Sequence, residues 1–198
     1  DGNTENRVLI SDAIPEGTVL DSVPTTGLPD DWTVVYSTDD PETTVPVASG
    51  EAGALPGANW TATAPGDLST VTRVGFIYDA GTTAPPANGT ALTGFTFDVI
   101  TSGLPGVGGT VDNLAQVFGQ TFDDPNDNID VDDEIVYDES GDDNPNNFND
   151  DGTPPDDTGS NFQPDVDTGV ADPDNDDIDE ENNNTGTGPD GEVNQVTI

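Results

Sequence analysis

Oxygen-bearing side chains recur at every second position in three stretches of the C-terminal part of this sequence. In a tight loop, side chains at positions i, i+2 and i+4 can face one centre, and Ca²⁺ takes roughly six to eight oxygen ligands. These stretches, and a fourth group of aspartates that precedes them, therefore predict several bound calcium ions. The candidate ligands are Asp123, Asp124, Asp127 and Asp130; Asp142, Asn144 and Asn146; Asn147, Asn149 and Asp151; and Asp172, Asp174 and Asp176.

None of these stretches is a complete EF-hand loop. Gly152 follows the second stretch, as the opening of the EF-hand pattern requires. An EF-hand also needs a bidentate glutamate at its twelfth position and a helix on each side. Counted from the start of each stretch, that position holds Thr153, Thr158 or Asn183. The pattern therefore indicates acidic calcium loops that are not EF-hands.

Negative charge is concentrated in the same part of the chain. The formal net charge is −39, and 26 of the 41 carboxylates lie in residues 120–198, where there is no Lys, Arg or His. A stretch such as residues 172–181 repels itself and has little apolar surface to bury, so it needs a counter-charge to become ordered. A hard divalent cation is the counter-charge that fits dense Asp and Asn.

A salt-adapted protein without specific metal sites is another explanation for this acidity. Such a protein would spread its acidic side chains over all exposed positions. Residues 1–119 carry only 15 carboxylates, so the clustering favours specific metal binding over a uniformly acidic surface.

Enzymatic chemistry has few residues to draw on in this sequence. There is no His, Cys or Lys, so most pairs of nucleophile and base cannot be built. A carboxylate pair of the glycosidase type remains, but one member of such a pair needs a raised pKa in an apolar pocket. No carboxylate outside a turn or a run of charges stands out as that residue. The sequence therefore predicts a protein that is not an enzyme.

The composition also limits the partners. The absence of Cys excludes disulfides and thiolate metal sites within this sequence. The negative charge disfavours nucleic acid and anionic membrane surfaces, which need cationic patches. No apolar run approaches the ~18 residues of a membrane span, so direct membrane insertion is not expected. The lack of Met and of a signal peptide predicts a processed product or a piece of a longer protein.

Short β-like runs separated by turn residues dominate residues 1–119. They predict an antiparallel β-sandwich whose core holds the aromatic side chains. Phe95, Phe97 and Val99 alternate with polar residues and are expected to share one face. The expected strands are residues 7–10, 32–36, 60–63, 74–78, 95–99 and 111–118.

Residues 120–198 lack strong periodicity and form a second region. Ile129 with Val131, and residues 135–137, are candidate strand pieces, and residues 192–198 are a better candidate. The expected organisation is therefore a β-sandwich over residues 1–119 and a long, acidic, loop-rich calcium-binding extension over residues 120–198 that ends in a strand.

Two motifs resemble the conserved-repeat surface modules of bacteria and archaea, the "domain of unknown function eleven" group. Residues 6–18 (NRVLISDAIPEGT) resemble the pattern Asn-Val-x-Ile-x-Asp-x-Ile/Leu-Pro-x-Gly-Thr, and residues 111–117 (VDNLAQV) resemble the closing strand Leu-x-Asn-x-Ala-x-Val. Residues 136–142 and 182–189 are similar to extensions of very long cyanobacterial surface proteins. The resemblance implies an Ig-like sandwich that is repeated along secreted or cell-surface chains, and it implies no catalytic residues.

One departure from that family predicts how subunits join. Family members start with a strand that is followed by a Gly-Asn/Thr turn, whereas this sequence opens at the turn, in residues 1–4. A missing strand leaves an open edge and a core groove. Residues 191–198 alternate like a strand, so Val193, Val196 and Ile198 are expected to fill the groove of the next subunit. Such a head-to-tail contact would produce a homopolymer.

Together these observations predict an extracellular or cell-surface structural protein. It would be a calcium-stabilised repeat unit of a filament or surface layer. The alternative is an adhesin module whose acidic loops hold calcium in order to bind a glycan or another cell.

Overall fold

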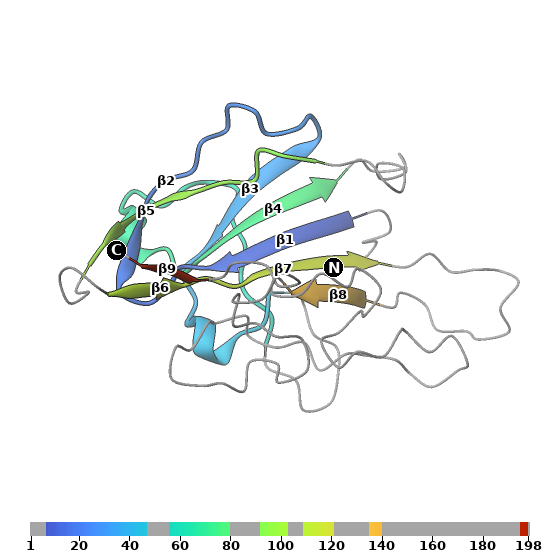
Figure 1. Cartoon of the computed structure of the whole chain (residues 1–198). Coiled ribbons are helices and arrows are strands. Elements are labelled where there is room, and N and C mark those ends of the chain that lie inside the picture. The colour runs from blue at the N-terminus through green and yellow to red at the C-terminus, as the bar shows by residue number, and fades with distance from the viewer. Residues whose placement is uncertain are drawn as a thin grey trace, which may run out of the picture.

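The computed structural model describes residues 7–46, 56–79, 92–102, 109–120, 135–139 and 195–197. In this part of the chain every regular element is a strand or a short 3₁₀ helix (Figure 1). The described part is therefore all-β, as the sequence predicts. The strands are β1 (Arg7–Ala13), β2 (Thr18–Ser22), β3 (Trp32–Ser37), β4 (Arg73–Asp79), β5 (Asp98–Thr101), β6 (Thr110–Asp112), β7 (Ala115–Gln120), β8 (Ile135–Glu139) and β9 (Gln195–Thr197), and the 3₁₀ helices are η1 (Pro41–Thr43) and η2 (Leu68–Thr70).

Five strands form one antiparallel sheet in the order β3-β4-β1-β7-β8. β1 lies at its centre and pairs with β4 on one side and β7 on the other. These strands are rich in β-branched and aromatic residues, which pack well on a pleated surface. Two separate antiparallel ladders, β2–β5 and β6–β9, complete the described strands.

One face of the five-stranded sheet carries the main hydrophobic core. Register pairs such as Val34↔Phe76 put alternate residues of β3 and β4 on this face, because successive side chains of a strand point to opposite faces. The ring centroid of Phe95 lies 4.5 Å from that of Trp32 and 5.4 Å from that of Phe76. The core thus joins β2 and the segment before β5 to the large sheet as a second layer. Its buried members are Leu20, Trp32, Val34, Tyr36, Val71, Val74, Phe76 and Tyr78, with Phe95 and Phe97 packed against them.

The turn between β1 and β2 carries the chain from one layer to the other. The backbone N–H of Thr18 donates to the carbonyl oxygen of Pro15 at 3.1 Å, and the Thr18 hydroxyl donates to the same oxygen at 2.7 Å. Gly17 has φ 72, a conformation that glycine adopts without a steric penalty. The Pro-Glu-Gly-Thr sequence is therefore suited to this tight connection.

The opposite face of the large sheet is covered by the segment around η1 and by Trp60, whereas η2 packs with β2 on the core face. Gly75 in β4 lies directly under Trp60, where a Cβ atom would sit 3.0 Å from two atoms of the indole ring and 2.9 Å from Cγ2 of Val35. The Trp60 indole N–H donates to the carbonyl oxygen of Pro46 at 2.7 Å. The indole is therefore held against the sheet at a position that needs glycine.

The structure confirms some of the expected strands and corrects others. Strands at residues 7–10, 32–36, 74–78 and 135–137 are present as β1, β3, β4 and β8. The expected strand at residues 60–63 is wrong, because this segment forms only an isolated bridge between Thr61 and Tyr36. The expected strand at residues 95–99 begins at Asp98, and the one at residues 111–118 is divided into β6 and β7. β2 is an additional strand that the sequence analysis missed.

Two described strands lie beyond residue 119, in the region expected to be an extension. β8 pairs with β7 at the edge of the large sheet, and β9 pairs with β6. Each ladder therefore pairs one described strand from residues 120–198 with a strand of the first region. The division into a sandwich and an extension stays a prediction, and the candidate strand piece at Ile129 and Val131 lies outside the described residues.

Candidate functional site

All the candidate calcium ligands, from Asp123 to Asp176, lie outside the described residues. Within the described ranges, no group of three or more acidic, His or Cys side chains is placed so that it could hold a metal ion. In those same ranges, no helix is long and apolar enough to cross a membrane. The calcium prediction therefore depends on the sequence clusters alone.

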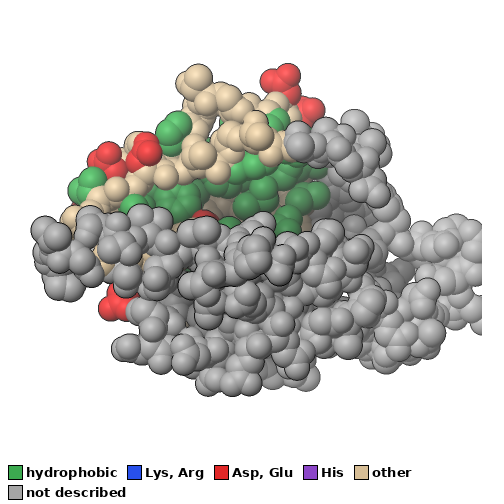
Figure 2. All heavy atoms as spheres, in the orientation of Figure 1, with side chains coloured by type: hydrophobic (Ala, Val, Ile, Leu, Met, Phe, Trp, Pro, Cys, Tyr) green, Lys and Arg blue, Asp and Glu red, His purple; other side chains and the backbone are tan. Residues whose placement is uncertain are grey.

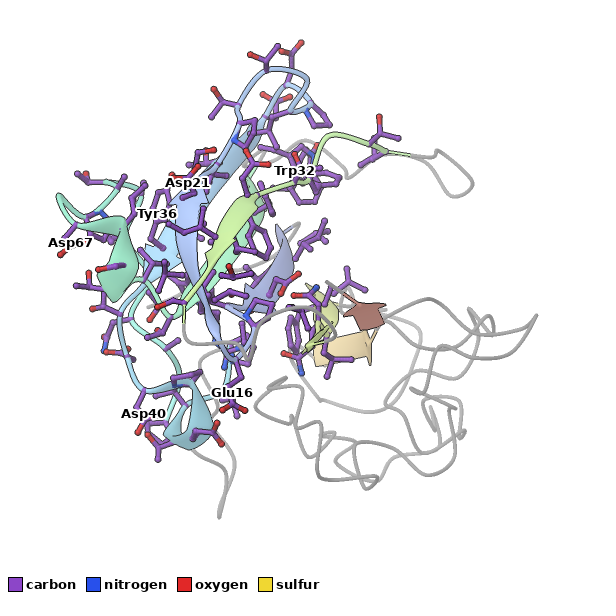
Figure 3. All side chains as sticks on the ribbon, turned by 60° about the vertical axis from the view of Figure 1, so that its left-hand side comes forward. Glu16, Asp21, Trp32, Tyr36, Asp40 and Asp67 are labelled. Atoms are coloured by element: carbon purple, nitrogen blue, oxygen red, sulfur yellow. The ribbon has the colours of Figure 1, made fainter. Side chains whose placement is uncertain are left out.

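The acidic side chains of the first region are dispersed. Figure 3 shows Glu16, Asp21, Asp40 and Asp67 at separate places along the first region. Asp67 caps η2, where it accepts hydrogen bonds from the backbone N–H and the hydroxyl of Ser69 at 3.1 Å and 2.7 Å. These bonds lower the pKa of Asp67. Asp67 thus stabilises a local turn, and among the described residues these carboxylates do not form a metal-binding group.

The expected assembly strand is paired within its own chain. Val196 lies in β9 opposite Val111 of β6, and the ladder has three registered pairs, from Thr110↔Thr197 to Asp112↔Gln195. Val193 and Ile198 lie outside the described residues. The C-terminal strand thus has a partner that the sequence analysis did not identify.

The outer edge of β3 is bonded at two of its residues, Trp32 and Tyr36. The backbone of Tyr36 donates to the carbonyl oxygen of Thr61 and accepts from its N–H, both at 2.9 Å, and the N–H of Trp32 donates to the carbonyl oxygen of Pro29 at 3.4 Å. In the second layer, Ile100 of β5 is 53% exposed. These bonds block strand addition at the Tyr36 end of the β3 edge, and Ile100 leaves an apolar side chain accessible at β5.

The core face is incompletely covered near β7. The register pair Ile10↔Val117 places Val117 on the core face, yet its side chain is 38% exposed. Figure 2 shows hydrophobic side chains gathered in a band across this view, with most of the visible acidic side chains around its rim. The second layer therefore protects the core better over β3 and β4 than over β7.

A buried carboxyl lies where the two family-like motifs meet. Asp12, near the end of β1, is 8% exposed and accepts a hydrogen bond on Oδ2 from Nδ2 of Asn113 at 3.0 Å. Asn113 lies between β6 and β7, and Asp12 pairs in register with Ala115 of β7. Neither Oδ1 of Asp12 nor Oδ1 of Asn113 has a hydrogen-bond partner in the described part, and both atoms are buried.

Burial raises the pKa of Asp12 from 3.8 to about 7. The hydrogen bond from Asn113 and the positive charge of Arg73 act in the opposite direction but do not offset the loss of hydration. This finding corrects the expectation that no carboxylate would stand out in an apolar setting. The signal in the sequence was the strand alternation Val8, Ile10, Asp12, which placed the acid on the core face.

Arg73 is a buried cation that holds the segment around η1, which we call the covering loop. Its side chain is 1% exposed, and Nη2 donates to the carbonyl oxygens of Pro41 at 3.3 Å and Thr44 at 3.4 Å. These carbonyls belong to the first residue and the C-cap of η1, and Asp40 caps its N-terminus. Arg73 therefore links the start of β4 to η1 on the face opposite the core.

Comparison with known protein families gives one match. The family described as "Domain of unknown function (DUF7925)" matches residues 1–148, a span that includes β1 to β8 and the first candidate calcium clusters. No curated protein and no solved structure matches the chain. Since the match covers most of its length, the chain belongs to the DUF7925 family.

Proposed function

We propose that this chain is a structural repeat unit of an extracellular fibre or surface layer. The unit is an Ig-like β-sandwich that calcium stabilises, and its copies join head-to-tail when the C-terminal strand of one copy adds to the sheet of the next. The observation that carries the proposal is the β6–β9 ladder, in which a short strand is held by three registered pairs to a strand far from it in sequence.

Two features support an Ig-like arrangement. Antiparallel strands pack in two layers around one core, as in the immunoglobulin sandwich. The motif around β1 and the motif around β7, which resemble opposite ends of the conserved-repeat modules, are neighbours in one sheet.

The β6–β9 ladder supports strand exchange between copies. The register that joins Val196 to Val111 can form equally well between two chains, because an exchanged strand makes the same contacts with the partner copy. Residues 140–194 separate β8 from β9, so the covalent link is long enough for either arrangement. The donated strand and the strand that accepts it are different surfaces of the chain. Each added copy therefore offers a new acceptor, and the assembly grows into a filament unless the copies close into a ring.

The open part of the core face near β7 supports an apolar contribution to the same contact. Val117 and Ile100 remain accessible on the two layers. Val193, Val196 and Ile198 would bring apolar side chains to such a surface, and added strands combine backbone hydrogen bonds with side-chain plugs.

Calcium would offset the electrostatic repulsion between copies. Two bodies with a net charge of −39 each repel one another, and a divalent cation bound between acidic loops offsets that repulsion. The Asp and Asn clusters of residues 123–176 are the proposed ligands.

The test is a deletion of residues 191–198, followed by electron microscopy and sedimentation in millimolar calcium. We expect ordered assemblies from the full chain and single subunits from the truncated one. Val196→Pro, which removes a backbone donor from β9, should act like the deletion, whereas the matched control Val196→Ile should assemble normally.

Two outcomes would count against the proposal. Filaments of normal length and order from the truncated chain would rule out strand donation. A full chain that stays monomeric in calcium and binds a glycan would instead identify a calcium-dependent adhesin.

A further inference from the structure

We propose that Asp12 and Asn113 form a proton-operated latch between β1 and the β6–β7 junction. In its closed form, the protonated carboxyl of Asp12 and the carboxamide of Asn113 pair through two hydrogen bonds. In its open form, the carboxylate keeps at most the single bond to Nδ2. The inference concerns folding and strand position and does not depend on the proposed function.

The closed form accounts for two buried oxygens that otherwise have no partner. Nδ2 of Asn113 already donates to Oδ2 of Asp12 at 3.0 Å. The remaining oxygens of the two groups, both called Oδ1, are buried and accept no hydrogen bond from the described residues. A carboxylic acid carries a hydrogen on one oxygen, so Oδ1–H of Asp12 can donate to Oδ1 of Asn113. Two parallel bonds between planar groups then satisfy all four polar atoms.

The open form lacks that hydrogen. An ionised carboxylate only accepts, so Oδ1 of Asp12 and Oδ1 of Asn113 would both present lone pairs in a buried setting. A buried polar atom without a partner is destabilising. Removal of the proton therefore favours separation of Asn113 from β1, or entry of water between them.

Few charged groups act on Asp12 from the surrounding elements. On either side of it in the sheet lie Val74 of β4 and Ala115 of β7, which do not titrate. The charged group that acts on it is Arg73 of β4. Glu16, in the turn that follows β1, is exposed. The positive charge of Arg73 favours ionisation, but burial outweighs it and raises the pKa of Asp12 to about 7.

The latch acts on the strand that holds β9. Asn113 directly follows β6, which ends at Asp112, and β6 pairs with β9. Fixing Asn113 to β1 therefore fixes the end of β6 relative to the large sheet. Protonation of one carboxyl in the core is thus coupled to the order of the β6–β9 ladder.

The first test compares pH-dependent stability of the full chain and of Asp12→Asn. An asparagine at position 12 has no proton to lose and can still exchange two hydrogen bonds with Asn113. Because folding raises the Asp12 pKa, the wild type should lose stability relative to this variant as the pH rises from about 4 to about 7. A shift of that size corresponds to about a thousandfold change in the folded-to-unfolded ratio. Asp21→Asn, which removes an exposed carboxylate, is the matched control and should run parallel to the wild type.

A second test separates a latch from a merely buried acid. In NMR titrations of the wild type, the Asp12 carboxyl carbon and the Asn113 side-chain amide protons should shift with one common midpoint near neutral pH. Asn113→Leu, which identifies the amide signals by their loss, should also lower hydrogen-exchange protection in residues 110–112 at acidic pH. Parallel stability curves for wild type and Asp12→Asn would overturn the proposal. So would an Asp12 titration that the Asn113 amide does not follow.

Discussion

The indole ring of Trp60 lies over Gly75 because that position in β4 has no side chain. The ring is fixed by the hydrogen bond from its N–H to the carbonyl oxygen of Pro46, so it cannot move away without losing that partly buried bond. An added methyl group would meet two ring atoms at 3.0 Å and Val35 Cγ2 at 2.9 Å. These distances make Gly75 a sensitive probe of how the covering loop packs on the sheet.

We therefore expect Gly75→Ala to lower the free energy of unfolding by about 1–3 kcal/mol, the usual cost of overpacking a well-packed region. Denaturant unfolding would measure the change. Gly66→Ala is the matched control, because a Cβ there has no atom within 4 Å. The control should lie within about 0.5 kcal/mol of the wild type. If both substitutions changed the free energy of unfolding equally, the Trp60 ring would be able to move aside for an added methyl group at position 75.

The buried Asp12 shows what a residue-scale prediction from sequence can and cannot find. Alternation along β1 was visible, but the carboxyl lies within a motif that could be interpreted as a strand and a turn. Its partner Asn113 is remote in sequence, and only the β1–β7 pairing brings the two together. The calcium candidates are the opposite case, because their spacing is local and can be recognised from sequence alone.

A strand could be predicted from the sequence where its own consecutive residues favour β-structure, and not where a partner remote in sequence determines it. β3 and β4 were predicted because each contains consecutive β-branched or aromatic residues, and β1 because it contains the apolar run Val8, Leu9 and Ile10. Residues 60–63 have a similar composition but lie across the β3 edge, where only Thr61 pairs, with Tyr36. β2 was missed because its five residues follow a tight turn closely, and its strand character comes from the pairing with β5. Cross-strand partners of this kind are set by tertiary contacts, which local composition does not contain.

At the scale of elements, we expect the two regions to respond differently to calcium removal. β1, β3 and β4 share a hydrophobic core, whereas the candidate calcium ligands lie in residues 123–176. Chelation should therefore raise hydrogen exchange first in residues 122–184 and leave the amides of β1, β3 and β4 protected. Exchange measured by mass spectrometry, with and without EGTA, would show this order. Equal loss of protection in both regions would argue against two separate sources of stability.

At the scale of the whole molecule, the net charge of −39 makes folding sensitive to cations in general. Specific calcium sites and general screening differ in the concentration that they require. Extracellular calcium modules bind with Kd of roughly 10⁻⁴–10⁻³ M. At calcium concentrations of one to ten times Kd, each independent site that is absent from the unfolded chain stabilises by about 0.4–1.4 kcal/mol.

We therefore expect millimolar calcium to raise Tm by several degrees above its value in EGTA at moderate salt. Sodium chloride at matched ionic strength should produce a much smaller shift. Differential scanning calorimetry of the full chain would provide both values. A Tm that responds equally to the two salts would favour the salt-adapted explanation and remove the case for specific sites.

The distance in sequence between β8 and β9 has a mechanical consequence. The β6–β9 ladder has three registered pairs, whereas β1 is paired along both of its sides. Tension applied between β1 and β9 would therefore break the hydrogen bonds of the β6–β9 ladder before those of the five-stranded sheet. Residues 140–194 would then enter the force path, with a contour length of roughly 180 Å when fully extended. Extension of these residues would lengthen the subunit by several times the length of one strand while its core stayed folded. The subunit would then dissipate mechanical work along the direction of pull.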